Sequence, residues 1–305
     1  MTTPAPPGLT RPDTDPLPEA VALPRGIGQL RRAVEYAAPP GYRPLLLDLY
    51  VPSGDPPPVV LFVHGGGWRL GTRSVFCPTW RNWDPNPFHR LVAAGLAVAS
   101  VDYRLSGEAV FPAQLHDVTA AVHWLHTRAD ELGLDAGRIV TWGESAGGHL
   151  AALLGLTAAR PDLSDLVGRT PVPALAGVVD WYGPSDLTTL QSQARPDAVT
   201  RSDAADSRES LLLGAPLPKA TELARRASPV AYVHPAAPPF HLAHGADDRF
   251  VPAEQSRELA TLLRDAGVPA TLDIVPGADH MWRGATDPEA VFDAAVDFTR
   301  RVVKI

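Results

Sequence analysis

The chain has 305 residues, of which 45% are hydrophobic and 20% are charged, and its formal net charge is −7. This length is sufficient for one large α/β domain with an extensive core. The negative charge and the lack of a Lys/Arg cluster argue against a nucleic-acid-binding surface, so we expect no nucleic-acid partner. The single cysteine, Cys77, excludes an internal disulfide framework and a cysteine-based metal site.

The first part of the chain, residues 1–28, is rich in proline and lacks apolar periodicity. We therefore expect an extended N-terminal arm, followed by the main domain at 29–305. The arm has neither the basic region nor the apolar region of a secretory signal. Because no run approaches the roughly 18 apolar residues needed to span a membrane, we expect a cytoplasmic protein with no membrane partner. The oligomeric state is left open.

From residue 59 onward, apolar runs typical of buried strands alternate with segments of helical periodicity. This alternation predicts a mostly parallel sheet flanked by helices and joined by right-handed crossovers. The segment 183–233 breaks the pattern with short helical pieces, polar loops and prolines, and we interpret it as a small cap or insertion. The predicted strands are 31–37, 45–51, 59–63, 97–101, 139–142, 174–181, 239–243 and 271–275, and the predicted helices are 87–94, 112–128, 148–159, 253–266 and 288–303.

A serine lies between a predicted strand and a predicted helix, in the run Gly143-Glu144-Ser145-Ala146-Gly147. A G-x-S-x-G pattern in a strand–turn–helix context is typical of a nucleophile on a strained turn. Side chains two residues before or after the serine would collide with neighbouring backbone, which explains glycine at both positions. The turn is expected to raise the Ser145 hydroxyl above the sheet, at the amino end of the next helix.

A nucleophilic serine needs a base, and the chain has ten histidines. His280 follows the last predicted strand and precedes the closing helix, so we expect it to be the base. The orienting carboxylate is expected in the loop after the preceding strand, which contains Asp247 and Asp248. Serine, acid and histidine in this order is one known arrangement of a catalytic triad. Only one of the two aspartates can orient the imidazole, and the pattern does not distinguish them.

A glycine run, His64-Gly65-Gly66-Gly67, follows the buried strand at 59–63. Glycines there allow backbone N–H groups to face a substrate without an intervening Cβ. We expect the N–H groups of Gly66, Gly67 and Ala146 to form an oxyanion hole. Five residues next to these loops are candidates for the substrate pocket, with the core as their alternative location: Trp68, Trp181, Tyr182, Met281 and Trp282.

With these motifs, the chain resembles the α/β-hydrolase superfamily. Within it, the chain looks like the esterases that carry HGGGW and GESAGGHLA, which are grouped with hormone-sensitive-lipase-like and bifunctional feruloyl/acetyl-xylan esterases. The resemblance runs from about residue 45 to the C-terminus. It implies an α/β-hydrolase fold and assigns the triad acid to Asp248, four residues after His244. Glu144 and His149 are expected to have structural roles beside the serine.

These observations predict a serine carboxylic-ester hydrolase that acts on small to medium acyl esters through an acyl-enzyme. Such a reaction needs no metal and no organic cofactor, and its partner is a small-molecule ester. An aryl formamidase or another amide-directed hydrolase uses the same residues and is an alternative. A peptidase of the prolyl-oligopeptidase type is disfavoured because only tens of residues precede the hydrolase motifs. A non-catalytic small-molecule-binding protein is disfavoured because every catalytic residue is present.

Overall fold

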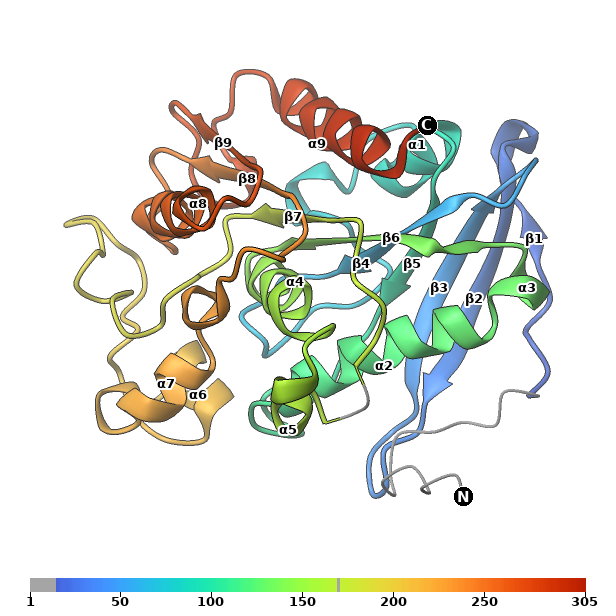
Figure 1. Cartoon of the computed structure of the whole chain (residues 1–305). Coiled ribbons are helices and arrows are strands. Elements are labelled where there is room, and N and C mark those ends of the chain that lie inside the picture. The colour runs from blue at the N-terminus through green and yellow to red at the C-terminus, as the bar shows by residue number, and fades with distance from the viewer. Residues whose placement is uncertain (1–14, 169–170) are drawn as a thin grey trace.

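The computed structural model describes residues 15–168 and 171–305 of the chain. Within these ranges, nine strands form one sheet (Figure 1). Four strands begin earlier than predicted from the apolar runs, at Gly28, Pro58, Asp135 and Ala270. Two begin later, at Gly177 and Phe240, and the strand Val21–Ala22 was not predicted. The strands are β1 (Val21–Ala22), β2 (Gly28–Ala37), β3 (Leu45–Pro52), β4 (Pro58–Val63), β5 (Ala97–Val101), β6 (Asp135–Glu144), β7 (Gly177–Trp181), β8 (Phe240–Gly245) and β9 (Ala270–Val275).

The strand order across the sheet is β1-β2-β3-β5-β4-β6-β7-β8-β9. The pairs from β1 to β5 are antiparallel. Every pair from β5 to β9 is parallel, so the carboxyl ends of these strands meet at one edge of the sheet. The prediction of a mostly parallel sheet is therefore confirmed.

Helices cover both faces of this sheet (Figure 1). One face carries α1 (Pro87–Ala93) and α9 (Pro288–Val303), and the other carries α2 (Ala113–Thr127), α4 (Ala146–Thr157) and α8 (Glu254–Asp265). Helix α9 begins where the Asp287 side chain accepts a hydrogen bond from Ala290 N, with proline in the first turn. No helix among the two described ranges is long and apolar enough to cross a membrane.

Strand β4 shows why the core forms on both faces of the sheet. All six of its residues are buried, and it lies between β5 and β6. Successive side chains of a strand point to opposite faces. Accordingly, Leu61 and Val63 pack in the cluster beneath α2 and α4, whereas Val60 and Phe62 pack in the cluster beneath α1 and α9. A continuous apolar run is what a doubly covered parallel strand requires.

The segment 183–233 lies beyond the carboxyl edge of the parallel strands and contains α6 (Arg208–Leu213) and α7 (Thr221–Arg226). Two further short helices, α3 (Ala129–Leu132) and α5 (Ser164–Val167), follow α2 and α4. Of the predicted arm, residues 1–14 lie outside the described ranges. Strand β1 belongs to its remainder and pairs with β2. The division into arm, domain and insertion stays a prediction.

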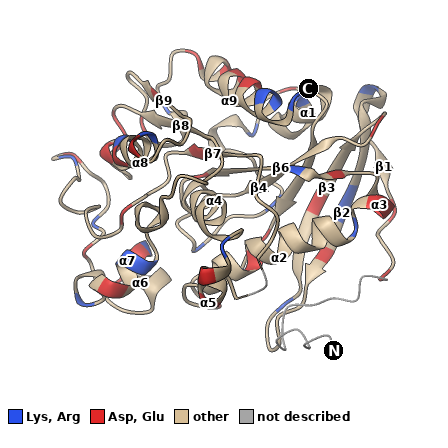
Figure 2. Ribbon diagram, viewed as in Figure 1, with Lys and Arg blue, Asp and Glu red and all other residues tan. Residues whose placement is uncertain are grey.

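Charged residues of both signs lie on the helices, intermixed along α8 and separated along α9, as Figure 2 shows. In α9, for example, acidic residues lie in the first turn and Arg300 and Arg301 in the last. This distribution opposes the helix dipole at each end and is favourable there.

Candidate active site

Ser145 lies on the turn between β6 and α4 with φ 53° and ψ −119°. A residue with a side chain seldom adopts a positive φ, so this turn is strained. A Cβ on Gly143 would lie within 3.0 Å of the Gly147 backbone, and a Cβ on Gly147 within 3.0 Å of the Val63 backbone. Real Cβ atoms do not approach so closely. Glycine is therefore required on both sides of the serine, as the pattern indicated.

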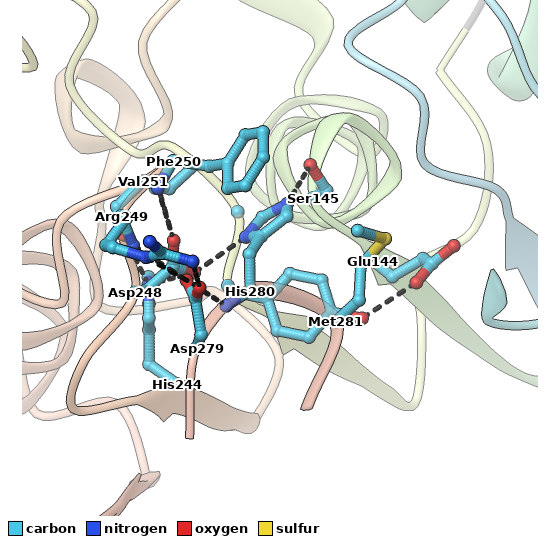
Figure 3. Close-up of polar contacts among 12 residues, drawn as sticks. Glu144, Ser145, His244, Asp248, Arg249, Phe250, Val251, Asp279, His280 and Met281 are labelled. Carbon is cyan, nitrogen blue, oxygen red and sulfur yellow. Dashed lines mark hydrogen bonds and ion pairs between the residues drawn. The ribbon is translucent and has the colours of Figure 1, made fainter. Parts of the chain in front are cut away.

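Three polar side chains from distant parts of the chain meet in one line (Figure 3). Ser145 Oγ lies 3.0 Å from His280 Nε2, and His280 Nδ1 lies 2.6 Å from Asp248 Oδ2. A carboxylate only accepts, so Nδ1 carries the proton and donates it to Asp248. Nε2 is then the acceptor for the serine hydroxyl, which is the arrangement needed to remove its proton.

Asp248 is fully enclosed by hydrogen-bond donors. Its Oδ1 accepts from the backbone N–H groups of Phe250 at 2.8 Å and Val251 at 2.9 Å. The second oxygen faces His280 and also lies 3.3 Å from His244 Nε2. Burial disfavours the ionised form, but the charge of His280 and the hydrogen bonds from both histidines outweigh it and hold the pKa of Asp248 below its usual value.

The neighbouring aspartate points away from this line. Asp247 is exposed, and its Oδ1 lies 3.2 Å from Arg195 Nη1. Of the two aspartates that the pattern left open, Asp248 is thus the one brought to His280, in agreement with the residue that the family resemblance implied.

A second ion pair ties together the two loops that carry Asp248 and His280. Arg249 donates from its backbone N–H and from Nε to the Asp279 carboxylate, at 2.9 Å and 2.8 Å. Asp279 also accepts from the His280 N–H at 2.7 Å. Because each partner adjoins a member of the Ser–His–Asp line, this pair fixes the spacing of the two loops (Figure 3).

Two aromatic rings enclose the His280 imidazole. The Phe250 ring stacks on one side, with centroids 5.1 Å apart and an interplanar angle of 26°. The Tyr182 ring lies 4.7 Å away at an angle of 59°. Phe250 was not among the residues expected at the site, although its place two residues after Asp248 was a usable signal.

The glycine loop and the start of α4 line the same cavity as Ser145 and His280, and its volume is about 320 Å³. Gly66, Gly67 and Ala146 all contribute to the lining. Gly66 has φ 114°, and a Cβ there would lie within 3.0 Å of the Leu70 carbonyl. The close packing leaves only a glycine backbone on the side of the loop that faces the serine.

Of the five residues expected in a substrate pocket, Trp68 and Met281 line the cavity. The structure instead places Trp181, Tyr182 and Trp282 in the core, where they are 0–3% exposed and pack on one another edge to face. Trp181 ends β7, Tyr182 follows it, and Trp282 lies in the loop after β9. Four further residues of the lining were not expected from the sequence, because neither 183–233 nor the residues after Trp68 carry a motif: Arg69, Leu70, Arg208 and Glu209.

His149 connects α4 to the insertion behind the serine. Its Nε2 lies 2.6 Å from the Ala227 carbonyl and therefore donates to it. Nδ1 is then an acceptor, and Trp68 Nε1 donates to it at 3.3 Å. This buried chain of hydrogen bonds holds Trp68 in the cavity wall, in agreement with the structural role expected for His149.

Glu144, which precedes the serine, is buried against the glycine loop. Tyr182 donates its hydroxyl hydrogen to Glu144 Oε2 at 2.7 Å, and the Gly65 N–H points to Oε1 at 3.4 Å. Burial raises the pKa of Glu144 from 4.5 to about 7, against the opposing effect of the Tyr182 hydrogen bond. The carboxyl therefore changes charge near neutral pH at one wall of the cavity.

This shift predicts a pH dependence of stability that Glu144→Gln removes. Between pH 4.5 and about 7 the folded protein keeps the proton that the unfolded chain releases. The stabilisation is complete below pH 4.5 and is lost as the pH rises to about 7, by roughly 3 kcal/mol at most. Urea unfolding across this range should show a falling free energy for the wild type relative to the variant. Parallel curves would contradict the prediction, and Glu254→Gln, at an exposed carboxyl of α8, is the control.

Comparisons with known proteins identify relatives over most of the chain. The BD-FAE family model matches residues 47–263. Esterase LipC and esterase LipQ of Mycobacterium tuberculosis are each 32% identical to the chain, and the alignments cover 82% and 85% of it. The same alignments cover only 59% and 60% of those two proteins, so the chain spans about 60% of their length.

Among solved structures, a truncated form of a carbohydrate esterase from gut microbiota is similar over 93% of this chain and 99% of its own, with a TM-score of 0.76 and 26% identity. Esterase B from Lactobacillus rhamnosis is similar over 93% of this chain and 89% of its own, with a TM-score of 0.72 and 22% identity. The second likeness concerns the fold alone.

Proposed function

The chain belongs to the BD-FAE family and has the α/β-hydrolase fold, and from this premise we propose that it is a serine carboxylic-ester hydrolase acting on small to medium acyl esters. The observation that carries the proposal is the continuous hydrogen-bonded line from Ser145 through His280 to Asp248, at 3.0 Å and 2.6 Å. Hydrolysis by such a line uses only side-chain and backbone groups, with the small-molecule ester and water as reactants.

In the first half of the proposed reaction, Ser145 Oγ attacks the ester carbonyl carbon while His280 Nε2 takes the hydroxyl proton. The carbonyl oxygen becomes an oxyanion and accepts hydrogen bonds from the N–H groups of Gly66, Gly67 and Ala146. Each such donor typically contributes about 3 kcal/mol to the transition state. Asp248 stabilises the imidazolium that forms, without taking its proton.

The tetrahedral intermediate then collapses to an acyl-enzyme. The bond between the carbonyl carbon and the alkoxy oxygen breaks, and His280 returns its proton to that oxygen, so that a neutral alcohol leaves. In the second half, His280 removes a proton from water as the water oxygen attacks the acyl carbon. The bond to Ser145 Oγ breaks, His280 reprotonates the serine, and the carboxylic acid is released.

The names of the relatives support ester hydrolysis over the alternatives. The two mycobacterial proteins are named esterases, and the gut-microbiota structure is named a carbohydrate esterase. For this chain, the cavity of about 320 Å³ and the apolar side chains of Leu70 and Met281 in its wall favour a compact acyl or aryl group over a polysaccharide. The cytoplasmic location stays a prediction from the sequence.

Comparing substrates tests the proposal directly. We expect p-nitrophenyl acetate and butyrate to be hydrolysed faster than p-nitro-N-formylaniline, since the esters have the better leaving group and the relatives are named for ester cleavage. A fluorophosphonate probe should label one serine per chain and stop turnover in proportion. Faster cleavage of the formamide would favour the amide-directed alternative, and failure of the probe to label Ser145 would support the non-catalytic binding protein.

A further inference from the structure

Arg208, the first residue of α6, forms part of the wall of the active-site cavity. Its side chain lies over the glycine loop so closely that a Cβ on Gly67 would come within 2.8 Å of Arg208 Nε. The backbone before it is held by Ser207, whose Oγ accepts from Ser210 N at 3.0 Å and donates to the Ser202 carbonyl at 2.8 Å. Arg208 is therefore anchored beside the expected oxyanion site.

The guanidinium of Arg208 has no carboxylate partner within ion-pair distance among the residues that the structure describes. It lies instead over the Phe250 ring, with Cζ 5.6 Å from the ring centroid. Phe250 in turn stacks on His280. The partly buried Arg208 differs in this from the buried Arg104, which pairs with Asp117 at 2.6 Å. The N–H donors of Arg208 are therefore available to a ligand in the cavity, and only the Phe250 ring separates the guanidinium from His280.

Two carboxyl groups, those of Glu144 and Glu209, also line the cavity. Burial raises the pKa of Glu209, although the positive charge of Arg208 opposes the effect. Burial also raises the pKa of Glu144, to about 7. Both groups therefore hold their protons more readily than exposed carboxyls. A second arginine, Arg69, is exposed and also lines the cavity, so two guanidinium groups contribute to its wall.

We propose that the cavity selects esters that bear a carboxylate near the scissile bond, and that Arg208 binds this carboxylate. The inference rests on the proposed ester hydrolysis and names its substrate class. A guanidinium presents parallel N–H donors that match the two oxygens of a carboxylate. A guanidinium in a cleft with low-dielectric walls also attracts an anion, in a chain whose net charge of −7 would otherwise repel it. Arg69, at the rim, adds to this attraction.

The test uses ester pairs that differ only in charge. On the alcohol side, m-butyryloxybenzoate is compared with m-butyryloxybenzamide; on the acyl side, the p-nitrophenyl monoester of adipate is compared with its primary amide. We expect the wild type to prefer the anion in at least one pair. Arg208→Met, which keeps the stem over Gly67, should lower the ratio of kcat/KM for anion and amide by about tenfold or more. The pair that responds identifies the side of the ester that carries the charge.

Arg208→Lys should retain part of the preference, and Arg257→Met, at an exposed arginine of α8 outside the cavity wall, should retain all of it. The ratio does not depend on the fraction of folded enzyme, so partial misfolding cannot imitate the result. An unchanged ratio in Arg208→Met, with amide-bearing esters still hydrolysed, would overturn the assignment of Arg208 while the ester hydrolase stands. If the wild type hydrolyses none of the four esters, the proposed function itself is overturned.

Discussion

Ser145→Ala is expected to lower kcat for p-nitrophenyl butyrate by roughly 10⁵- to 10⁶-fold, because it removes the atom that attacks the ester in the proposed mechanism. Ser145 Oγ lies 3.0 Å from His280 Nε2 and at the wall of the cavity. The backbone contacts of the turn, such as Ser145 N to Trp181 O at 2.8 Å, do not involve the hydroxyl. The variant should therefore fold and still bind substrate.

Urea unfolding of the variant should match that of the wild type, and Ser53→Ala is the matched control. Ser53 is an exposed serine whose hydroxyl lies 3.4 Å from the Gly26 carbonyl. That variant should hydrolyse the ester at the wild-type rate. If Ser145→Ala keeps even a tenth of the wild-type kcat, Ser145 is not the nucleophile.

Asp248→Asn is expected to lower kcat by about 10⁴-fold, since an amide of the same shape selects the wrong tautomer of the base. The asparagine oxygen can still accept from Phe250 N and Val251 N, which leaves its NH₂ group facing His280 Nδ1. Nδ1 must then accept, and the proton moves to Nε2, where it faces the serine. The imidazole no longer accepts the serine proton. Steady-state kinetics on p-nitrophenyl butyrate measure the loss.

Asp247→Asn makes the same chemical change one residue away and is the control for Asp248→Asn. Asp247 is exposed, and its ion pair with Arg195 is a surface contact of small energetic value. The kcat of the Asp247→Asn variant should stay within about twofold of the wild-type value. Equal losses in the two variants would show that the loop as a whole, and not the buried carboxylate, supports activity.

The local part of the fold was predictable from the sequence, and the arrangement of its strands was not. The run at 59–63 and the serine turn each carry their own signal, since apolar residues and glycines are required there whatever surrounds them. Strand order depends on which surfaces pack in three dimensions. Strand β5 lies between β3 and β4, for example, and no periodicity in the chain encodes that placement.

The candidate active site was likewise predictable from the sequence only in part. The pattern placed Ser145 and His280, because each follows a strand whose position in the chain is informative. It did not separate Asp247 from Asp248, because the choice depends on which carboxylate the folded loop turns toward His280 and the N–H groups of Phe250 and Val251. It also could not tell that Trp181 lies in the core while Met281 lines the cavity, since adjacency to a loop does not fix the direction of a side chain.

The two aromatic rings against His280 restrict the rotation of its side chain already in the folded protein, before any substrate binds. With the Phe250 ring at 5.1 Å and the Tyr182 ring at 4.7 Å, the imidazole has little room to rotate about its bond to Cβ. Restricting a side chain costs conformational entropy, and here the cost falls on folding. In the proposed reaction the entropy cost of ordering His280 is therefore not incurred again at each turnover. More of the substrate's binding energy is then left to lower the activation barrier of ester hydrolysis.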